Sequence, residues 1–143
     1  MQFMMIVKAS RHCEAGNKPS GESLAAIRNY TQELRKAGAL VELSRLHPSS
    51  KGARVKLSKG NRIVTDGPFA ETKELIAGYW IIQVKSMEDA IEWAKRVPAP
   101  GGEEESEIEI RQFLEIEDFA PGETLDGAVE LGRDLIKTRT QAQ

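Results

Sequence analysis

The stretch "IAGYWIIQVKSMEDAIEWAK", residues 76–95, contains a strand followed directly by a helix. Apolar residues occupy both alternating faces of its first ten positions, which predicts a central strand covered on each side. Ser86 then begins a helix, with Asp89 three residues on as in a capping box. Pro98 ends this helix. Its expected buried stripe consists of Ala90, Ile91, Ala94 and Val97.

The same order of strand and helix occurs at the start of the chain. Residues 3–8 predict a strand with two apolar faces. A loop is expected over residues 10–22, "SRHCEAGNKPSGE". Apolar residues at helical spacing follow, with Ser20 or Ser23 as the N-cap and Gly38 at the C-terminal end. A second strand, "ALVELSRLH", covers residues 39–47.

Two further segments complete the pattern. Residues 53–65 predict a β-hairpin that turns at Lys59-Gly60-Asn61. Residues 107–116, "EIEIRQFLEI", predict the last strand. Its expected buried face consists of Ile108, Ile110, Leu114 and Ile116. The order β-α-β, hairpin, β-α-β is the split βαβ, or ferredoxin-like, arrangement of an α+β fold.

Two helices cover only one face of such a sheet, and the other face is expected to be apolar as well. We therefore predict a homodimer in which two copies pack sheet to sheet. The alternative is a C-terminal helix that folds back over the open face. The predicted domain covers residues 1–119, and residues 120–143 are expected to form an amphipathic helical tail.

The composition narrows the classes of function. A net charge of -2 gives no electrostatic reason to expect direct binding to nucleic acid or to an anionic membrane. No apolar run is long enough to span a bilayer, and the N-terminus reads as a strand rather than a signal peptide. Cys13 is the single cysteine, so no intrachain disulfide can form, and a cytoplasmic location is expected.

The topology predicts where a site would lie. In this fold the first two strands run parallel, so the ends of both strands and the start of the strand after the hairpin share one edge of the sheet. The inserted segment leaves and returns at that edge. We therefore expect His47, Asp66, Glu71 and Lys73 to lie close together, with Arg11, His12 and Cys13 as neighbours.

Three motifs carry a family resemblance. They are "DGPFAETKELIAGYW" at residues 66–80, "RLHPSSKGARV" at residues 45–55 and "IEIRQF" at residues 108–113. Together they resemble the YCII-related family, and specifically its DGPF-domain branch. The resemblance implies a ferredoxin-like fold that pairs into a dimeric α+β barrel. It also implies an enzyme-like protein, without a settled substrate, in which His47 and Asp66 carry the suspected roles.

The first functional hypothesis is an enzyme-like protein that binds a small polar or partly aromatic molecule. His47 would act as general acid or base and Asp66 would orient it, while Lys73 or Arg54 would bind an anionic group of the ligand. Glu71 would orient that group. Tyr79 and Trp80 lie on opposite faces of their strand, so that one packs under the helices and the other lines a dimer cavity.

The same residues also admit purely structural interpretations. Asp66 can serve only to fix the turn, and Glu71 with Lys73 can form a surface ion pair of little energetic value. No cofactor is implied. A zinc site is not predicted, because the chain lacks a close-spaced ligand pair.

The alternative class of function is a non-catalytic sensing or regulatory module. The resemblance suggests a sigma factor as its partner, with the tail as the docking element, and the sequence does not decide whether the protein is an enzyme.

Overall fold

The computed structural model describes residues 1–99, 105–118 and 130. The chain divides into two units, Met1–Phe113 and Leu114–Gln143. Within the second unit, Ile116–Asp118 forms a short 3-10 turn, η3. The predicted helical tail lies outside the described residues, apart from residue 130. No helix among the described residues has the length and apolar character needed to cross a membrane.

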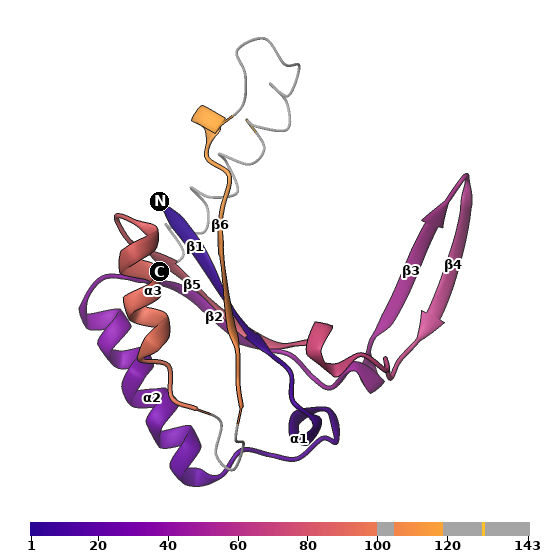
Figure 1. Cartoon of the computed structure of the whole chain (residues 1–143), viewed down its shortest axis with the longest axis horizontal. Helices are drawn as coiled ribbons and strands as arrows, with labels where there is room; N and C mark the ends of the chain where they lie inside the picture. The colour runs from indigo at the N-terminus through magenta and orange to yellow at the C-terminus, as the bar shows by residue number, and fades with distance from the viewer. Residues whose placement is uncertain (100–104, 119–129, 131–143) are drawn as a thin grey trace. The chain divides into compact units, whose positions relative to one another are not determined.

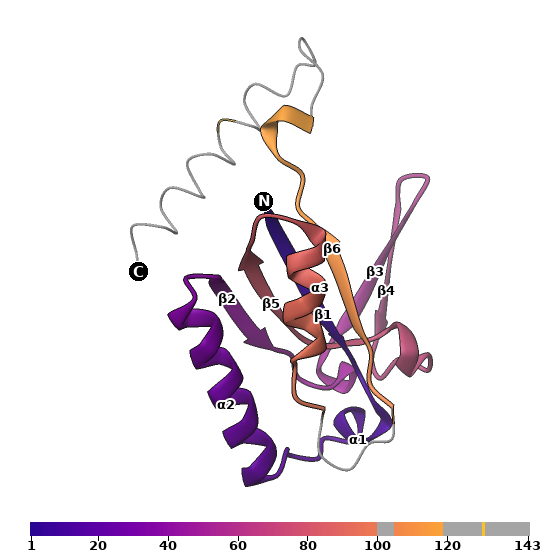
Figure 2. The ribbon, with the colours of Figure 1, turned by 60° about the vertical axis from the view of Figure 1, so that its left-hand side comes forward.

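The first unit is built on a four-stranded antiparallel sheet (Figure 1). Strands β1 and β2 both pair antiparallel with β5 and are therefore parallel to each other, as predicted. Two helices cover one face of the sheet (Figure 2), so the ferredoxin-like α+β fold is confirmed. In the order β2-β5-β1-β6, the strands are Leu40–Arg45, Ile76–Gln83, Gln2–Lys8 and Ile108–Gln112, and the helices are α2, Gly21–Lys36, and α3, Met87–Lys95.

The helices begin and end where local chemistry satisfies their terminal backbone groups. The Ser20 hydroxyl accepts a hydrogen bond from the Ser23 amide at the start of α2. Gly38 follows the end of that helix with a φ of 69°, which only glycine adopts without strain. The Ser86 hydroxyl caps α3 by accepting from the Asp89 amide. These capping predictions are confirmed.

The core lies between the helices and one face of the sheet. Its largest fully buried side chains come from β1, α2 and β5, namely Phe3, Met5, Leu34 and Ile82. Tyr30 packs edge-on against Trp80, with ring centroids 5.5 Å apart, and its hydroxyl donates to the Trp93 carbonyl at 2.9 Å. Burial raises the pKa of Tyr30, although the nearby Arg96 opposes the shift. The phenol therefore stays protonated and keeps α2 tied to α3.

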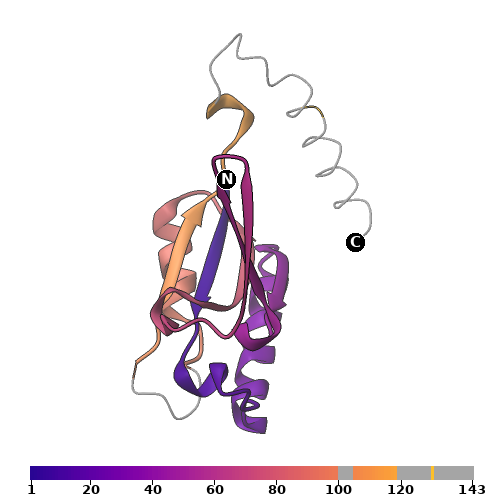
Figure 3. The same ribbon diagram turned by 90° about the vertical axis from the view of Figure 1, so that its right-hand side faces the viewer.

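The hairpin forms a second, two-stranded sheet of its own, made of β3, Ala53–Ser58, and β4, Asn61–Asp66. It pairs with none of the other four strands (Figure 1 and Figure 3). Lys59 and Gly60 form the turn with positive φ, and Asn61 already belongs to β4. Four aliphatic side chains of the hairpin are each at least 52% exposed: Val55, Leu57, Ile63 and Val64.

Two predictions of local structure are wrong. The segment predicted as a loop contains a one-turn helix, α1, Arg11–Glu14, which Ser10 caps by accepting from the Cys13 amide at 3.1 Å. The last strand ends at Gln112 rather than at residue 116. Leu114 is 74% exposed and does not share the partly buried face of Ile108 and Ile110.

Candidate functional site

The segments predicted to converge at one edge of the sheet do so. Lys8, at the end of β1, pairs with Ile76, and Arg45, at the end of β2, pairs with Gly78. The Leu46 amide donates to the Ala77 carbonyl at 2.8 Å. The inserted segment thus leaves the sheet after β2 and returns to the same edge at the start of β5.

A hydrogen-bonded cluster fixes this edge, and sequence reasoning missed it. The Glu14 carboxylate accepts from the Ser49 amide at 3.1 and 3.2 Å and from the Ser49 hydroxyl at 2.5 Å. The same hydroxyl accepts from the Phe69 amide at 3.1 Å. Glu14 therefore links α1 to the loop after β2 and to the Asp-Gly-Pro-Phe segment. No local pattern signals this role of Glu14, because its partner Ser49 lies 35 residues away.

Gly67 is required by a close approach of two backbones. A Cβ at this position would lie 1.7 Å from the Ser49 carbonyl oxygen, well inside van der Waals contact. The Gly67 amide donates to the Gly52 carbonyl at 2.9 Å, which holds the two segments together. The neighbouring Asp66 carboxylate forms no hydrogen bond within the described part of the chain, so the turn is not fixed by that side chain.

His47 and Asp66 both belong to segments of this cluster. His47 lies two residues before Ser49, and Asp66 pairs with Ala53 at the base of the hairpin. Both side chains are exposed, and among the described residues no hydrogen bond or ion pair joins them. Their action as an acid–base pair stays a prediction.

The other predicted ligand-binding residues are scattered. Arg54 places its guanidinium carbon 3.9 Å from the centroid of the Phe69 ring. Glu71 and Lys73 are exposed around the short 3-10 turn η2, Thr72–Glu74, and form no ion pair with each other. Trp80 packs in the core beneath the helices. Tyr79 lies on the opposite face, where its hydroxyl donates to Glu42 at 2.9 Å.

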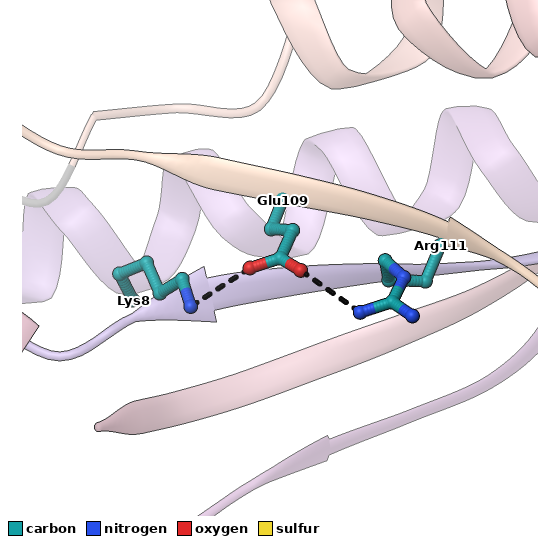
Figure 4. Close-up of polar contacts among 3 residues, drawn as sticks. All are labelled: Lys8, Glu109 and Arg111. Carbon is teal, nitrogen blue, oxygen red and sulfur yellow. Dashed lines mark hydrogen bonds and ion pairs between the residues drawn. The ribbon is translucent and has the colours of Figure 1, made fainter. Parts of the chain in front are cut away.

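The face that carries Tyr79 also carries a chain of charged side chains (Figure 4). Glu109 accepts from Lys8 at 2.8 Å and from Arg111 at 3.3 Å. The hydrogen bond from Lys8 and the one from Arg111 hold the pKa of Glu109 below its usual range. Lys8 is therefore already paired with a carboxylate.

A cavity of about 130 Å³ opens on the helix side of the sheet, where α1 and the N-terminal half of α2 meet β1, β2 and β5. His47 and Asp66 are not among its lining residues. Most of the wall surface is apolar, and the apolar lining residues are Val7, Pro19, Ile27, Leu43, Ala77, Trp80, Val97, Pro98 and Ile108. Gly78 also lines the cavity, and the polar lining residues are Lys8, Ser10, His12, Cys13, Asn17, Ser23, Ser44, Arg45, Tyr79 and Ser106.

α1 explains how His12 and Cys13 both reach this cavity. On an extended chain adjacent side chains diverge, but here the two residues share one helical turn, and both line the cavity. His12 is exposed, with its Nδ1 3.4 Å from the Asn17 side-chain nitrogen, and Cys13 is partly buried. The cavity wall therefore carries an imidazole, which can serve as an acid or base, and a thiol, which can serve as a nucleophile.

No metal site is evident in the described part of the chain, which holds no group of three or more His, Cys, Asp or Glu side chains suited to a metal ion. The indole N–H of Trp80 is buried and lacks a hydrogen-bond partner among the described residues. Since buried donors are normally paired, a water or ligand acceptor would be the usual explanation for such a group beside a cavity.

The fold is that of a ferredoxin-like α+β domain, with a small, mostly apolar cavity on the helix side of its sheet. Residues 1–114 match the YCII-related domain, and the chain belongs to the YCII-related family. An uncharacterised protein of Rhizobium meliloti (strain 1021) is 42% identical over 71 residues, which are 50% of this chain and 54% of that protein. The chain thus spans about half the length of this curated relative.

Proposed function

We propose that the protein binds a small molecule in the cavity beside α1 and acts on it as an enzyme-like protein. A cavity of about 150 Å³ accommodates benzene in another protein, so the 130 Å³ measured here suits a single ring or a short branched chain. Mostly apolar walls with a few polar groups are typical of small-molecule sites. The observation that carries the proposal is that His12 and Cys13 line the same cavity.

His12 is the proposed acid or base. Its pairing with the Asn17 amide leaves the other ring nitrogen available to a ligand, and histidine changes protonation close to neutral pH. Cys13 is held by the N-terminal cap of α1, whose Ser10 hydroxyl accepts from the Cys13 amide. The backbone of both candidate groups is therefore positioned before a ligand binds.

The second candidate is the rim that carries His47 and Asp66, in the DGPF-branch interpretation of the family. There His47 would be the acid or base, Asp66 its orienting group, and Arg54 or Lys73, with Glu71, would bind the ligand. The hydrogen bonds from Ser49 to Glu14 and Phe69 favour it, because they fix the two segments on which His47 and Asp66 lie.

NMR spectroscopy of the two histidines separates these candidates. The chain contains only His12 and His47, so two sets of imidazole signals are expected and single His→Ala variants assign them. We expect a small-molecule ligand found by screening to shift the ring signals of His12 and to leave those of His47 unchanged. A shift confined to His47, lost in the Asp66→Asn variant, would favour the rim instead.

We also propose that two copies form a homodimer through the open sheet face. On the two central strands this face carries Met4, Ile6 and Tyr79, which are partly exposed, and Ile81, which is already buried. The hairpin also has a face with several aliphatic side chains, since Val55 and Leu57 lie on the same face as Val64. Period-two alternation is typical of a half-buried strand, and a second copy would supply the missing cover.

Sedimentation or light scattering tests the assembly. We expect a dimer for the wild type, and a dissociation constant raised by about 30-fold or more when lysine replaces Ile6 on the sheet face. Leu57→Lys tests the hairpin face, and Thr65→Lys, on the opposite face of the hairpin, is its matched control. A wild type that stays monomeric at high concentration would contradict the proposal.

A regulatory module that contacts a sigma factor remains the alternative class. The helical tail that would dock lies outside the described residues. We also propose a cytoplasmic location. With Cys13 as its single cysteine the chain can form no intrachain disulfide, which is typical of proteins in a reducing compartment.

A further inference from the structure

The charges on the cavity wall point to the chemical class of the ligand. We propose that the cavity takes a small monocarboxylate, with its ring or branched body inside and its carboxylate on the Arg45 guanidinium. This inference rests on the proposed function, because it concerns the same cavity. Beyond the proposed function, it specifies that the ligand is an anion and that Arg45 binds its charged group.

The described lining residues include three cationic or titratable nitrogen groups and no Asp or Glu. Lys8 is paired with Glu109 at 2.8 Å, and His12 contacts Asn17. Arg45 is different, because its guanidinium forms no hydrogen bond or ion pair within the part of the chain that the structure describes. The cavity thus has one unpaired permanent cation among its described walls.

Arg45 is held in place by its backbone. It ends β2, and its backbone pairs with Gly78 of β5. A Cβ at Gly78 would lie 2.7 Å from the Ser44 carbonyl oxygen and 3.2 Å from the Arg45 Cα, so the glycine permits the close approach of the two strand backbones at Arg45. Of the lining residues, Gly78 and Trp80 are buried, whereas Arg45 and His12 are exposed to solvent.

This layout fits an amphipathic anion. The apolar walls, including Ile27 and Trp80, would enclose the body of the ligand, and the guanidinium would receive two carboxylate oxygens in its planar fork. Pro19 and Ser23, at the N-terminal end of α2, also line the cavity, and the dipole of this 16-residue helix favours a negative charge there. A neutral amide of the same shape would keep only the apolar contacts.

Cys13 provides a direct readout, because it is the only thiol and it lines the cavity. The rate of its alkylation by N-ethylmaleimide, a neutral reagent, would be measured with increasing benzoate or increasing benzamide. These probes share a ring and differ in charge. We expect benzoate to give half-protection at a concentration about tenfold lower than benzamide.

Three full-length variants locate the effect. Arg45→Gln is expected to remove the preference for benzoate, and Arg45→Lys to retain part of it, since lysine keeps the charge and loses the fork. Arg35→Gln removes an exposed charge from the far end of α2 and should change nothing. Circular dichroism checks that each variant is folded, and Arg45→Lys serves as the test if Arg45→Gln is not.

The outcomes are distinct. A benzoate preference that disappears in Arg45→Gln, or falls in Arg45→Lys, and that persists in Arg35→Gln supports the inference. Equal protection by benzoate and benzamide, unchanged by either Arg45 variant, overturns the inference and leaves the proposed function standing. Failure of both probes and of a wider set of ring and branched-chain compounds to protect Cys13 overturns the proposed function itself.

Discussion

Replacing Gly67 by alanine is expected to lower the free energy of unfolding by about 3 kcal/mol or more. The added methyl group would lie 1.7 Å from the Ser49 carbonyl oxygen, and both partners of this clash are backbone. Relief requires the segments to separate, which would break the Gly67 to Gly52 hydrogen bond and disturb the Phe69 to Ser49 bond. Urea denaturation measures the loss, and hydrogen exchange of the Phe69 amide reports where it occurs.

Gly21→Ala is the matched control for this substitution. Gly21 is the first residue of α2, and a Cβ there would meet nothing within 4 Å. Because alanine is the better helix former, this variant should be as stable as the wild type or more stable, by about 0.5–1 kcal/mol. A Gly67→Ala protein with unchanged stability and unchanged exchange at Phe69 would show that the two backbones do not approach as closely as described.

Removing the Glu14 carboxylate is the second large change, with an expected loss of about 2 kcal/mol of unfolding free energy in Glu14→Ala. The Ser49 amide and hydroxyl would lose their acceptor, and the Phe69 amide would lose the fixed position of the hydroxyl that it reaches. Because Glu14 ends α1, the same change should loosen His12 and Cys13 and speed the alkylation of the thiol.

Glu14→Gln is the comparison variant. Its side-chain carbonyl can still accept one of these bonds without charge assistance, so about half of the loss is expected. Chemical denaturation of the three proteins under the same conditions gives the differences. Equal stability of Glu14→Ala and wild type would mean that solvent replaces the carboxylate at Ser49 without cost.

The elements that the sequence predicts well are those whose signals are local. Ser20, Gly38 and Ser86 mark helix ends through hydrogen bonds to residues at most a few positions away or through positive φ, and each is found as expected. The strand order follows from chain connectivity and handedness, which are general rules. The convergence of the loops at one edge follows from that order, and it was therefore predictable as well.

The predictions fail where residues far away in the sequence determine the local structure. Alternation in residues 107–116 continues past Gln112, but β1, its pairing partner, begins at Gln2, so pairing ends with the hydrogen bond from the Phe113 amide to the Gln2 carbonyl. Glu14 bonds a serine 35 residues away. The cavity depends on how α1 and α2 sit against the sheet. The end of this strand, the Glu14 hydrogen bonds and the cavity cannot be recognised from a periodic pattern or a motif in the sequence.

The free hairpin poses a risk of aggregation. Both of its outer edges are unpaired with any other described strand, and such edges recruit strands from other molecules. Four basic side chains, Arg54, Lys56, Lys59 and Arg62, are all exposed along it. Two hairpins that met edge to edge would bring these like charges together, and the resulting repulsion would oppose the stacking of newly made chains.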